Sequence, residues 1–518
     1  MSSSKKISIY VFYAGLFGLS ISVSVSKFGT SLGMILLSIA LLLEWNWKQK
    51  RKLFQKNKCS LILSASLFLI FLLGILNSNN IVYGLKDLKI KAPLLIIPVV
   101  FSLSEVKLNK KIVLIALTLF SLAAIVASVI GFLSYQINLG KGVLLDLRTM
   151  SPYISLIRLS LILCFGFGFS LWGISVLKSK YKWLLLIFNF WIIYFLVSAE
   201  SLTGIVLLPI ISIYYLLFVS KRDSRLAISL GLIVFGLAIW IGFELKEIST
   251  MVFANKKSEI KEFTLNGRKY SHYRDIRFRE NGHLVYDNFC EEEMRQEWDK
   301  LSTKKYDYLF KGFNYGSILI RYLSSRGLSK DSIGVSKLSS MEVSAIQNGI
   351  TNVYYINRNP LFKRIHVAFM EVRDAYELKR YSGSSIASRF VYVTTGYQIF
   401  KDNFWFGVGT GDVKDAFLEQ YKKTKLLQDG CDKKSHNQYV TTALSLGIVG
   451  IFLFIGILFL LIKNYSGPMN YLFILGQIIV LLSMLWEDTL ETQAGVAVFG
   501  LLLNLFIFQK KADNILKT

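Results

Sequence analysis

Three short stretches near the C-terminal end of the chain hold residue types that could do chemistry on a lipid-borne substrate. An arginine stands among small residues in 384–389, a glycine turn occupies 405–412, and Ser-His-Asn-Gln forms 435–438. An apolar run from 440 to 462, which is long enough to span a bilayer, follows at once. This order predicts that the arginine and the histidine lie at a membrane surface.

His436 is the candidate general base. Ser435 followed three residues later by Gln438 is a capping-box pattern, which predicts that a helix starts at Ser435 with His436 in its first turn. The free N–H groups and the positive dipole at such an end attract phosphate and disfavour an imidazolium ion. A neutral imidazole there could accept a proton during transfer chemistry. The alternative is an interfacial histidine that only caps or packs.

Cationic side chains near the same surface could hold a phosphate group. The planar fork of Arg389 suits phosphate oxygens, and the alternative is an ordinary surface arginine. Arg158 lies about five residues inside an apolar span, where a charge is costly and marks a candidate functional site unless it snorkels to the interface. Lys86, Lys89 and Lys91 precede another span on the outer side; they could neutralise a lipid diphosphate or, as the pattern favours, anchor an interfacial helix.

Gly407, Gly409 and Gly411 alternate with other residues in the glycine turn. No βαβ pattern surrounds them, so we expect a tight turn that folds the Arg389 helix back towards the His436 helix rather than a dinucleotide site. The histidines do not have the spacing of zinc ligands, and neither a nucleophile elbow nor a paired-carboxylate pattern occurs. We therefore expect no metal and no cofactor.

The elements that must position these residues are membrane helices. The chain has 518 residues and is 53% hydrophobic, and apolar runs of spanning length recur along it. We predict an all-α polytopic membrane protein with about twelve spans. They lie near 8–25, 30–46, 59–76, 92–104, 112–133, 153–177, 183–198, 203–219, 226–243, 440–462, 471–486 and 493–508.

Charged residues between the spans predict the topology. Basic clusters follow every second span, as the positive-inside rule requires if both termini are cytoplasmic, and the loop after the tenth span fits only weakly. These clusters account for the net charge of +26, so we expect no nucleic-acid partner. Lys5 and Lys6 precede the first run without a clear cleavage site, which predicts a signal anchor.

One segment, 244–439, contains no spanning run and is large enough to form a domain. We predict transmembrane helices in 1–243 and 440–518 and a mainly helical periplasmic loop between them. Its predicted helices are 291–309, 339–348, 362–379 and 384–400, with a short hairpin in 269–285. Cys290 and Cys431 lie in this loop and could form a disulfide or remain two thiols.

The ordered set of Arg389, the turn at 403–411 and the stretch 435–439 resembles the O-antigen ligase and O-antigen polymerase superfamily. The following stretch 446–450 is similar to a motif in the last third of that superfamily. The stretches 328–331 and 347–352 resemble ligase-like proteins of Bacteroidota.

The resemblance implies a GT-C-like, metal-independent and inverting glycosyltransferase of the bacterial inner membrane, with its active site facing the periplasm. A polyprenyl-diphosphate-linked glycan would be the donor, and a sugar hydroxyl of lipid A–core or another glycan would be the acceptor. Arg389 and His436 match the essential arginine and histidine of the family, and Arg158 matches its intramembrane arginine. Together with Lys91, the two arginines are the candidate diphosphate ligands. The turn at 198–201, where family members often carry a basic residue, has none, so no function is transferred to it.

Two rival functions remain open at this point. A polymerase of the same superfamily would extend the glycan instead of transferring it to core, although polymerases more often have two sizeable outward loops. A non-enzymatic transporter would be expected to show broken helices in repeated halves, which the sequence lacks.

Overall fold

The computed structural model describes most of the chain. The described residues are 3–44, 46–141, 146–177, 180–219, 224–256, 259–273, 275–310, 312–381, 384, 386–424, 433–465 and 467–509. The chain divides into two compact units: Met1–Val234 with Arg389–Thr518, and Phe235–Ser388. Cys431 lies outside the described residues, so both alternatives for Cys290 and Cys431, a disulfide or two thiols, stay open.

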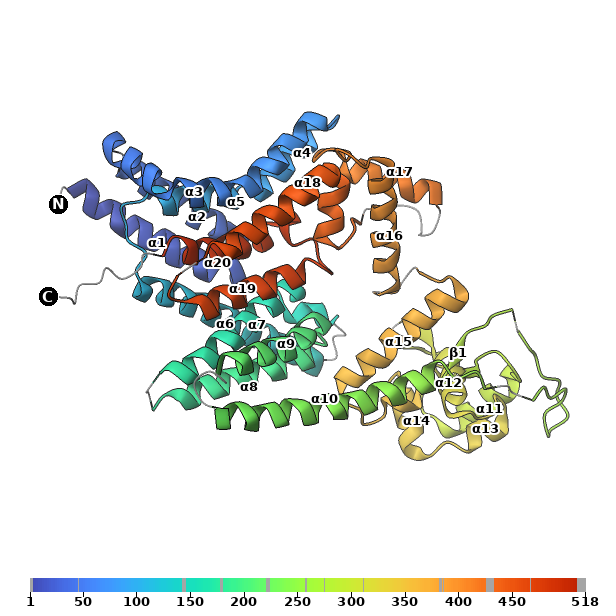
Figure 1. The fold of residues 1–518 in the computed structure, drawn as a ribbon. Helices are drawn as coiled ribbons and strands as arrows, with labels where there is room; N and C mark the ends of the chain where they lie inside the picture. The colour runs from blue at the N-terminus through green and yellow to red at the C-terminus, as the bar shows by residue number, and fades with distance from the viewer. Residues whose placement is uncertain are drawn as a thin grey trace. The chain divides into compact units, whose positions relative to one another are not determined.

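The first unit consists of helices and their connections in the part that the structure describes (Figure 1). Its helices are α1 (Ser3–Val25), α2 (Lys27–Leu43), α3 (Trp47–Leu73), α4 (Ile81–Lys91), α5 (Pro93–Leu103), α6 (Lys110–Gly140), α7 (Leu156–Val176), α8 (Lys182–Ser198), α9 (Leu202–Val219), α17 (Val413–Thr424), α18 (Gln438–Lys463), α19 (Asn470–Ser483) and α20 (Gln493–Ile507). Short 3-10 turns are η1 (Gly74–Asn77), η2 (Leu147–Met150) and η4 (Thr489–Glu491). Two more helices, α10 (Ser224–Val252) and α16 (Ala387–Asp402), connect the units along the chain.

The prediction of a helical membrane protein is confirmed, and each of the twelve predicted spans overlaps one of these helices. Six helices among the described residues are long and apolar enough to cross a membrane: those in Lys5–Val25, Trp47–Asn77, Lys110–Gly140, Leu156–Val176, Leu202–Val219 and Gln438–Lys463. Five further apolar helices have between 10 and 17 residues. Twelve crossings, the periplasmic loop and the division at 243/244 and 439/440 therefore stay predictions.

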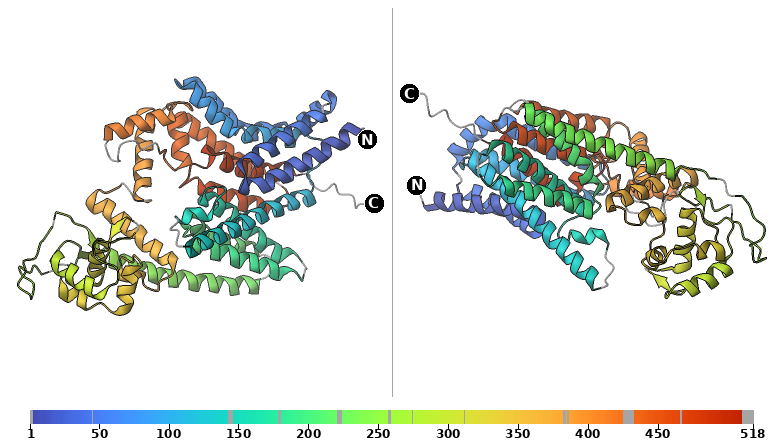
Figure 2. Two further views of the ribbon diagram at one scale, coloured as in Figure 1. Left: turned by 180° about the vertical axis from the view of Figure 1, so that it is seen from behind. Right: turned by 90° about the horizontal axis from the view of Figure 1, so that it is seen from below.

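The C-terminal helices pack among the N-terminal ones (Figures 1 and 2). Helix α18 packs on α3, α20 packs on α5, and α19 packs on α7. Every residue of α20 from Gly495 to Phe506 is buried. This packing brings the connection between α19 and α20 close to α4, where Glu491 meets Lys91 across 400 positions of sequence.

The second unit is a small domain with its own core, which includes Trp298, Tyr322 and Ile346. Its helices are α11 (Glu291–Leu301), α12 (Tyr315–Arg326), α13 (Ser332–Ser336), α14 (Ser340–Gln347) and α15 (Pro360–Leu378), with the 3-10 turn η3 (Val353–Tyr355). Two short antiparallel hairpins pair β1 (Arg279–Glu280) with β2 (His283–Leu284) and β3 (Leu309–Phe310) with β4 (Phe313–Asn314).

Secondary structure in this region agrees with the prediction in part. The helices predicted in 291–309, 339–348, 362–379 and 384–400 are confirmed as α11, α14, α15 and α16, and β1 and β2 lie in the predicted hairpin region. Helix α11 ends at Leu301 rather than at 309, where Ser302 turns to an extended backbone, and residues 309–310 pair as a strand. Helix α12 and the second hairpin were not predicted.

Helix α18 contains a break at Gly447, whose φ of 69° and ψ of −170° are accessible almost only to glycine. The break leaves the carbonyls of Leu444 and Ser445 free of the helix, and they accept hydrogen bonds from the backbone of Val408 and Gly409 at 2.9 Å each. The glycine turn is thereby attached to the middle of α18.

Replacing Gly447 with alanine is expected to destabilise the protein by about 1–3 kcal/mol, because the new Cβ would lie 2.2 Å from the carbonyl oxygen of Trp405 in a strained backbone. Gly456 is the matched control in the same helix, since a Cβ there meets nothing within 4 Å. Its alanine variant should be neutral or slightly stabilising. Thermal unfolding of both variants in detergent measures the difference, and equal unfolding temperatures would contradict the packing described.

Candidate functional site

Arg389 lies near the start of α16, and its guanidinium is engaged by a carboxylate. Its Nη2 donates a hydrogen bond to Oε1 of Glu487 at 2.8 Å. The arginine side chain keeps about 35% of its surface exposed, whereas that of Glu487 keeps 12%. The guanidinium is therefore fixed on one side and remains accessible to a ligand.

His436 lies just outside the first turn of α18, so the predicted helix start at Ser435 is wrong. The helix begins at Gln438, and Asn437 is its N-cap, with its side-chain oxygen accepting from the backbone N–H of Val440. Asparagine caps a helix as well as serine does. The hydroxyl of Ser435 does not cap α18 but accepts a hydrogen bond from the backbone N–H of Asn437 at 3.1 Å. His436 itself adopts a left-handed backbone conformation with a φ of 50°.

The imidazole of His436 faces the same carboxylate as Arg389. Its Nδ1 is buried and lies 3.9 Å from Oε2 of Glu487, which is beyond hydrogen-bond distance. The ring packs against Tyr392 of α16 with the centroids 5.4 Å apart. The side chain is 30% exposed, so one face is available to a substrate.

Glu487 belongs to an acidic segment, 487–491, which connects α19 to α20 and was not predicted as part of the site. Asp488 accepts a hydrogen bond from the backbone N–H of His436 at 3.0 Å and another from the hydroxyl of Thr441 at 2.7 Å. The sequence does carry a signal for this segment, because three acidic residues occur within five positions between two apolar runs.

Glu491, at the end of the acidic segment, joins it to α4. Its carboxylate contacts Nζ of Lys91 at 2.8 Å and Nζ of Lys434 at 2.6 Å. Burial alone would raise the pKa of Glu491, but the two ammonium groups outweigh burial and hold its pKa below the usual range. Glu491 is therefore a buried anion that holds two distant cations.

The predicted diphosphate ligand Lys91 is enclosed by protein. Its side chain is 1% exposed, its Nζ lies 2.5 Å from Asp87 and 2.8 Å from Glu491, and the ammonium stands 4.7 Å from the centre of the Phe71 ring. As Lys91 and Glu491 come from opposite ends of the chain, their contact ties α4 to the acidic segment.

Replacing Lys91 with methionine is expected to destabilise the protein by about 3–5 kcal/mol, because two buried carboxylates would lose their shared cation. Lys86→Met is the matched control, since Lys86 is an exposed lysine of the same helix. Thermal unfolding in detergent without substrate gives the comparison. A Lys91→Met protein that unfolds like the Lys86→Met protein but no longer binds donor would show that Lys91 acts on the substrate instead.

Arg158 approaches the same segment from α7. Its Nη1 donates to the hydroxyl of Ser155 at 2.9 Å, and the side chain lines a narrow cavity together with Ser483 and Thr489. The charges of Glu487 and Asp488 act on its guanidinium. The structure thus places Arg158, Arg389, His436 and Lys91 around one acidic segment.

The glycine turn follows the C-terminal end of α16 and is fixed against the segment between α3 and α4. Gly407 and Gly409 have φ values of 71° and 88°, which favour glycine. Thr410 donates from its backbone to Gly74 at 3.0 Å, and Gly411 donates to the hydroxyl of Ser78 at 2.9 Å. The close approach explains the glycines, because a Cβ on Gly409 would lie 2.4 Å from the backbone oxygen of Asn77.

Among the described residues, no group of three or more His, Cys, Asp or Glu side chains could hold a metal ion. The cations at this site are side chains. Two of them, Arg389 and Arg158, are the always-charged groups that suit phosphate oxygens.

Residues 340–455 match a family described as O-antigen ligase, and this segment contains Arg389, the glycine turn and His436. The match confirms the resemblance to the O-antigen ligase superfamily. No curated protein matches the chain.

Proposed function

We propose that this chain is a membrane glycosyltransferase that moves a glycan from a polyprenyl-diphosphate carrier to a sugar hydroxyl of lipid A–core, as an O-antigen ligase does. The observation that carries this proposal is the convergence of Arg389 and His436, both within the family match, on the carboxylate of Glu487. A fixed cation and an accessible imidazole beside it are the two groups that such a transfer needs.

The first step of the proposed reaction is placement of the diphosphate. Arg389 and Arg158 bind its oxygens and stabilise the negative charge that grows on the departing phosphate. Arg389 is paired with Glu487 before substrate binds, so the incoming diphosphate competes with this carboxylate for the guanidinium. Lys91 supports this arrangement through Glu491, and we assign it no direct contact with phosphate.

The second step is attack on the anomeric carbon. The acceptor hydroxyl forms the new C–O bond while the bond from the sugar to the diphosphate breaks, and the electron pair leaves with the phosphate. His436 takes the hydroxyl proton, and attack opposite the leaving group inverts the anomeric configuration. Asp488 holds the backbone of His436, and the ring of Tyr392 packs against the imidazole. The carboxylate of Glu487, 3.9 Å from Nδ1, favours the imidazolium that forms. The arginines supply the cationic charge, so we propose that no metal takes part.

A deletion strain tests this proposal against its nearest rival. Loss of lipid A-linked polymer with accumulation of lipid-linked polymer supports the ligase function. Accumulation of single lipid-linked repeat units would identify a polymerase instead, and unchanged surface glycan would exclude both. Transfer by purified protein in the presence of EDTA tests the metal-independent mechanism, which loss of activity and rescue by one divalent ion would overturn.

We also propose that the site faces the periplasm and that both termini are cytoplasmic, because basic clusters follow alternate spans. Lys304 is an exposed residue of the second unit and gives a test of this topology. A cysteine placed there in a cysteine-free background is expected to react with a membrane-impermeant maleimide once the outer membrane is opened. Labelling that requires opening of the inner membrane would contradict the topology.

A further inference from the structure

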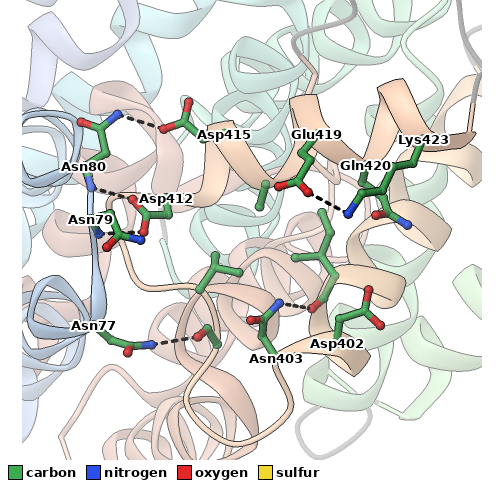
Figure 3. A pocket seen from close by; sticks show the side chains of 14 residues that line it. Asn77, Asn79, Asn80, Asp402, Asn403, Asp412, Asp415, Glu419, Gln420 and Lys423 are labelled. Carbon is green, nitrogen blue, oxygen red and sulfur yellow. Dashed lines mark hydrogen bonds and ion pairs between the residues drawn. The ribbon is translucent and has the colours of Figure 1, made fainter.

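A polar cleft of about 830 Å³ lies in the first unit and contains none of Arg158, Arg389 and His436 (Figure 3). Its walls are the C-terminal end of α16, the glycine turn, α17 and the segment before α4. A volume in this range is typical of pockets that enclose small organic ligands.

The lining of this cleft consists mostly of amide and carboxylate side chains. Among the described residues, five amides and four carboxylates line it, and Lys423 is the single cation. Ile399, Val408 and Ala416 supply a small apolar surface. Amides and carboxylates together can donate to and accept from hydroxyl groups, while the apolar surface can contact the C–H face of a sugar ring.

One wall of the cleft is held rigidly. Asp412 accepts hydrogen bonds from the backbone N–H groups of Asn79 and Asn80 at 2.7 Å each. The side chain of Asn80 donates to Asp415 at 2.9 Å, and that of Asn77 donates to the carbonyl of Gly407 at 2.8 Å (Figure 3). These bonds pre-order the backbone that carries the lining amides.

Other polar groups of the cleft remain available to a ligand. Among the described residues, the side-chain amides of Asn79 and Gln420 have no hydrogen-bond partner, and both line the cleft (Figure 3). Asp402 accepts one bond, from Gln398 at 3.0 Å, and Glu419 pairs with Lys423 at 2.7 Å. The excess of carboxylates over the single lysine repels an anionic ligand.

The cleft and the candidate reaction site lie near opposite ends of α16. Arg389 and Asp402 lie near the two ends of α16, and a helical rise of 1.5 Å per residue separates them by about 20 Å. A ligand that reaches from one to the other must therefore be an extended chain.

We propose that this cleft binds an uncharged or amino-sugar segment of a glycan, away from the sugar that reacts. The proposal rests on the glycan transfer proposed above. The bound segment can belong to the lipid-linked donor or to the acceptor, because both present the same hydroxyl-rich chemistry. The cleft thereby selects against glycans rich in uronic acid or phosphate.

Binding by the purified full-length protein in nanodiscs tests the proposal without any transfer reaction. The probe is an oligosaccharide released from the surface glycan of the producing cells, and tri-galacturonic acid is the anionic comparison. Wild type is expected to bind the released oligosaccharide and not the galacturonide. Replacing Asn79 and Gln420 together with alanine should weaken binding about 10-fold or more, whereas Gln136→Ala, an exposed amide on α6, should have no effect.

The carboxylates give a second, independent test. Asp402→Asn combined with Glu419→Gln should increase binding of tri-galacturonic acid, because the repulsion is removed. Absence of oligosaccharide binding by wild type, or equal binding by wild type and the Asn79→Ala/Gln420→Ala variant, would overturn the proposal.

Transfer kinetics identify which glycan occupies the cleft. A raised KM of the Asn79→Ala/Gln420→Ala variant for lipid-linked donor assigns the donor, and a raised KM for acceptor assigns the acceptor; unchanged KM values for both overturn the proposal. His436→Ala should bind the oligosaccharide like wild type, so failure of the cleft and failure of the proposed reaction are distinguishable.

Discussion

Replacing His436 with alanine is expected to slow glycan transfer by about 10²–10⁴-fold, the contribution typical of a general base. Donor binding should be largely retained, because Arg389 and its partner Glu487 do not depend on the imidazole. Donor binding and single-turnover transfer, measured at matched protein levels, separate the two effects.

His272→Ala is the matched control for this prediction, since His272 lies in the second unit and pairs with Asp287. It should transfer glycan like wild type. Near-normal transfer by His436→Ala would remove this residue from the chemistry. Loss of donor binding together with transfer, in a protein that is folded, would make His436 a binding residue instead of a base.

Replacing Arg389 with lysine should lower kcat by about 10²–10³-fold, the cost of removing one strong donor from a developing anion. Lysine keeps the positive charge, yet it lacks the planar fork that can bind two phosphate oxygens at once. Turnover and donor affinity should fall together. Arg295→Lys is the control, because Arg295 is a partly exposed arginine of α11 in the second unit that pairs with Glu291.

Glu487→Gln distinguishes a phosphate ligand from a structural partner. If Arg389 serves only to hold Glu487, the glutamine variant should show the same loss as Arg389→Lys. If Arg389 binds diphosphate, the glutamine variant should bind donor at least as well as wild type, because no carboxylate competes for the guanidinium. Donor titration of both variants decides between the two, and equal losses would contradict the proposed role.

The sequence by itself determined the class of the protein and the types of its chemical groups. Apolar runs of spanning length can bury their backbone polar groups only as helices, so their pattern predicts the elements without knowledge of packing. The candidate site was identified from equally local information: Arg389, the glycine turn and His436 follow one another in a single short segment. The family match covers that segment.

The sequence could not show which of two neighbouring residues caps the start of α18. Ser435 and Asn437 are both good N-cap residues, and the sequence pattern favoured the serine. Asp488, 52 positions away, binds the backbone N–H of His436 and so takes part in deciding where the helix begins. A contact at that sequence separation has no local signal.

The acidic segment shows most clearly which features the sequence determines and which only the tertiary structure decides. Its three carboxylates are visible in the sequence, but their partners Arg389, His436 and Lys91 lie 98, 52 and 400 positions away, respectively. Only the packing of α18, α19 and α20 among the N-terminal helices brings those charges together, because burial makes an unpaired carboxylate costly and each must find a cation or a donor. The sequence determined which groups are present, and the tertiary structure decided that one glutamate stands between the arginine and the histidine.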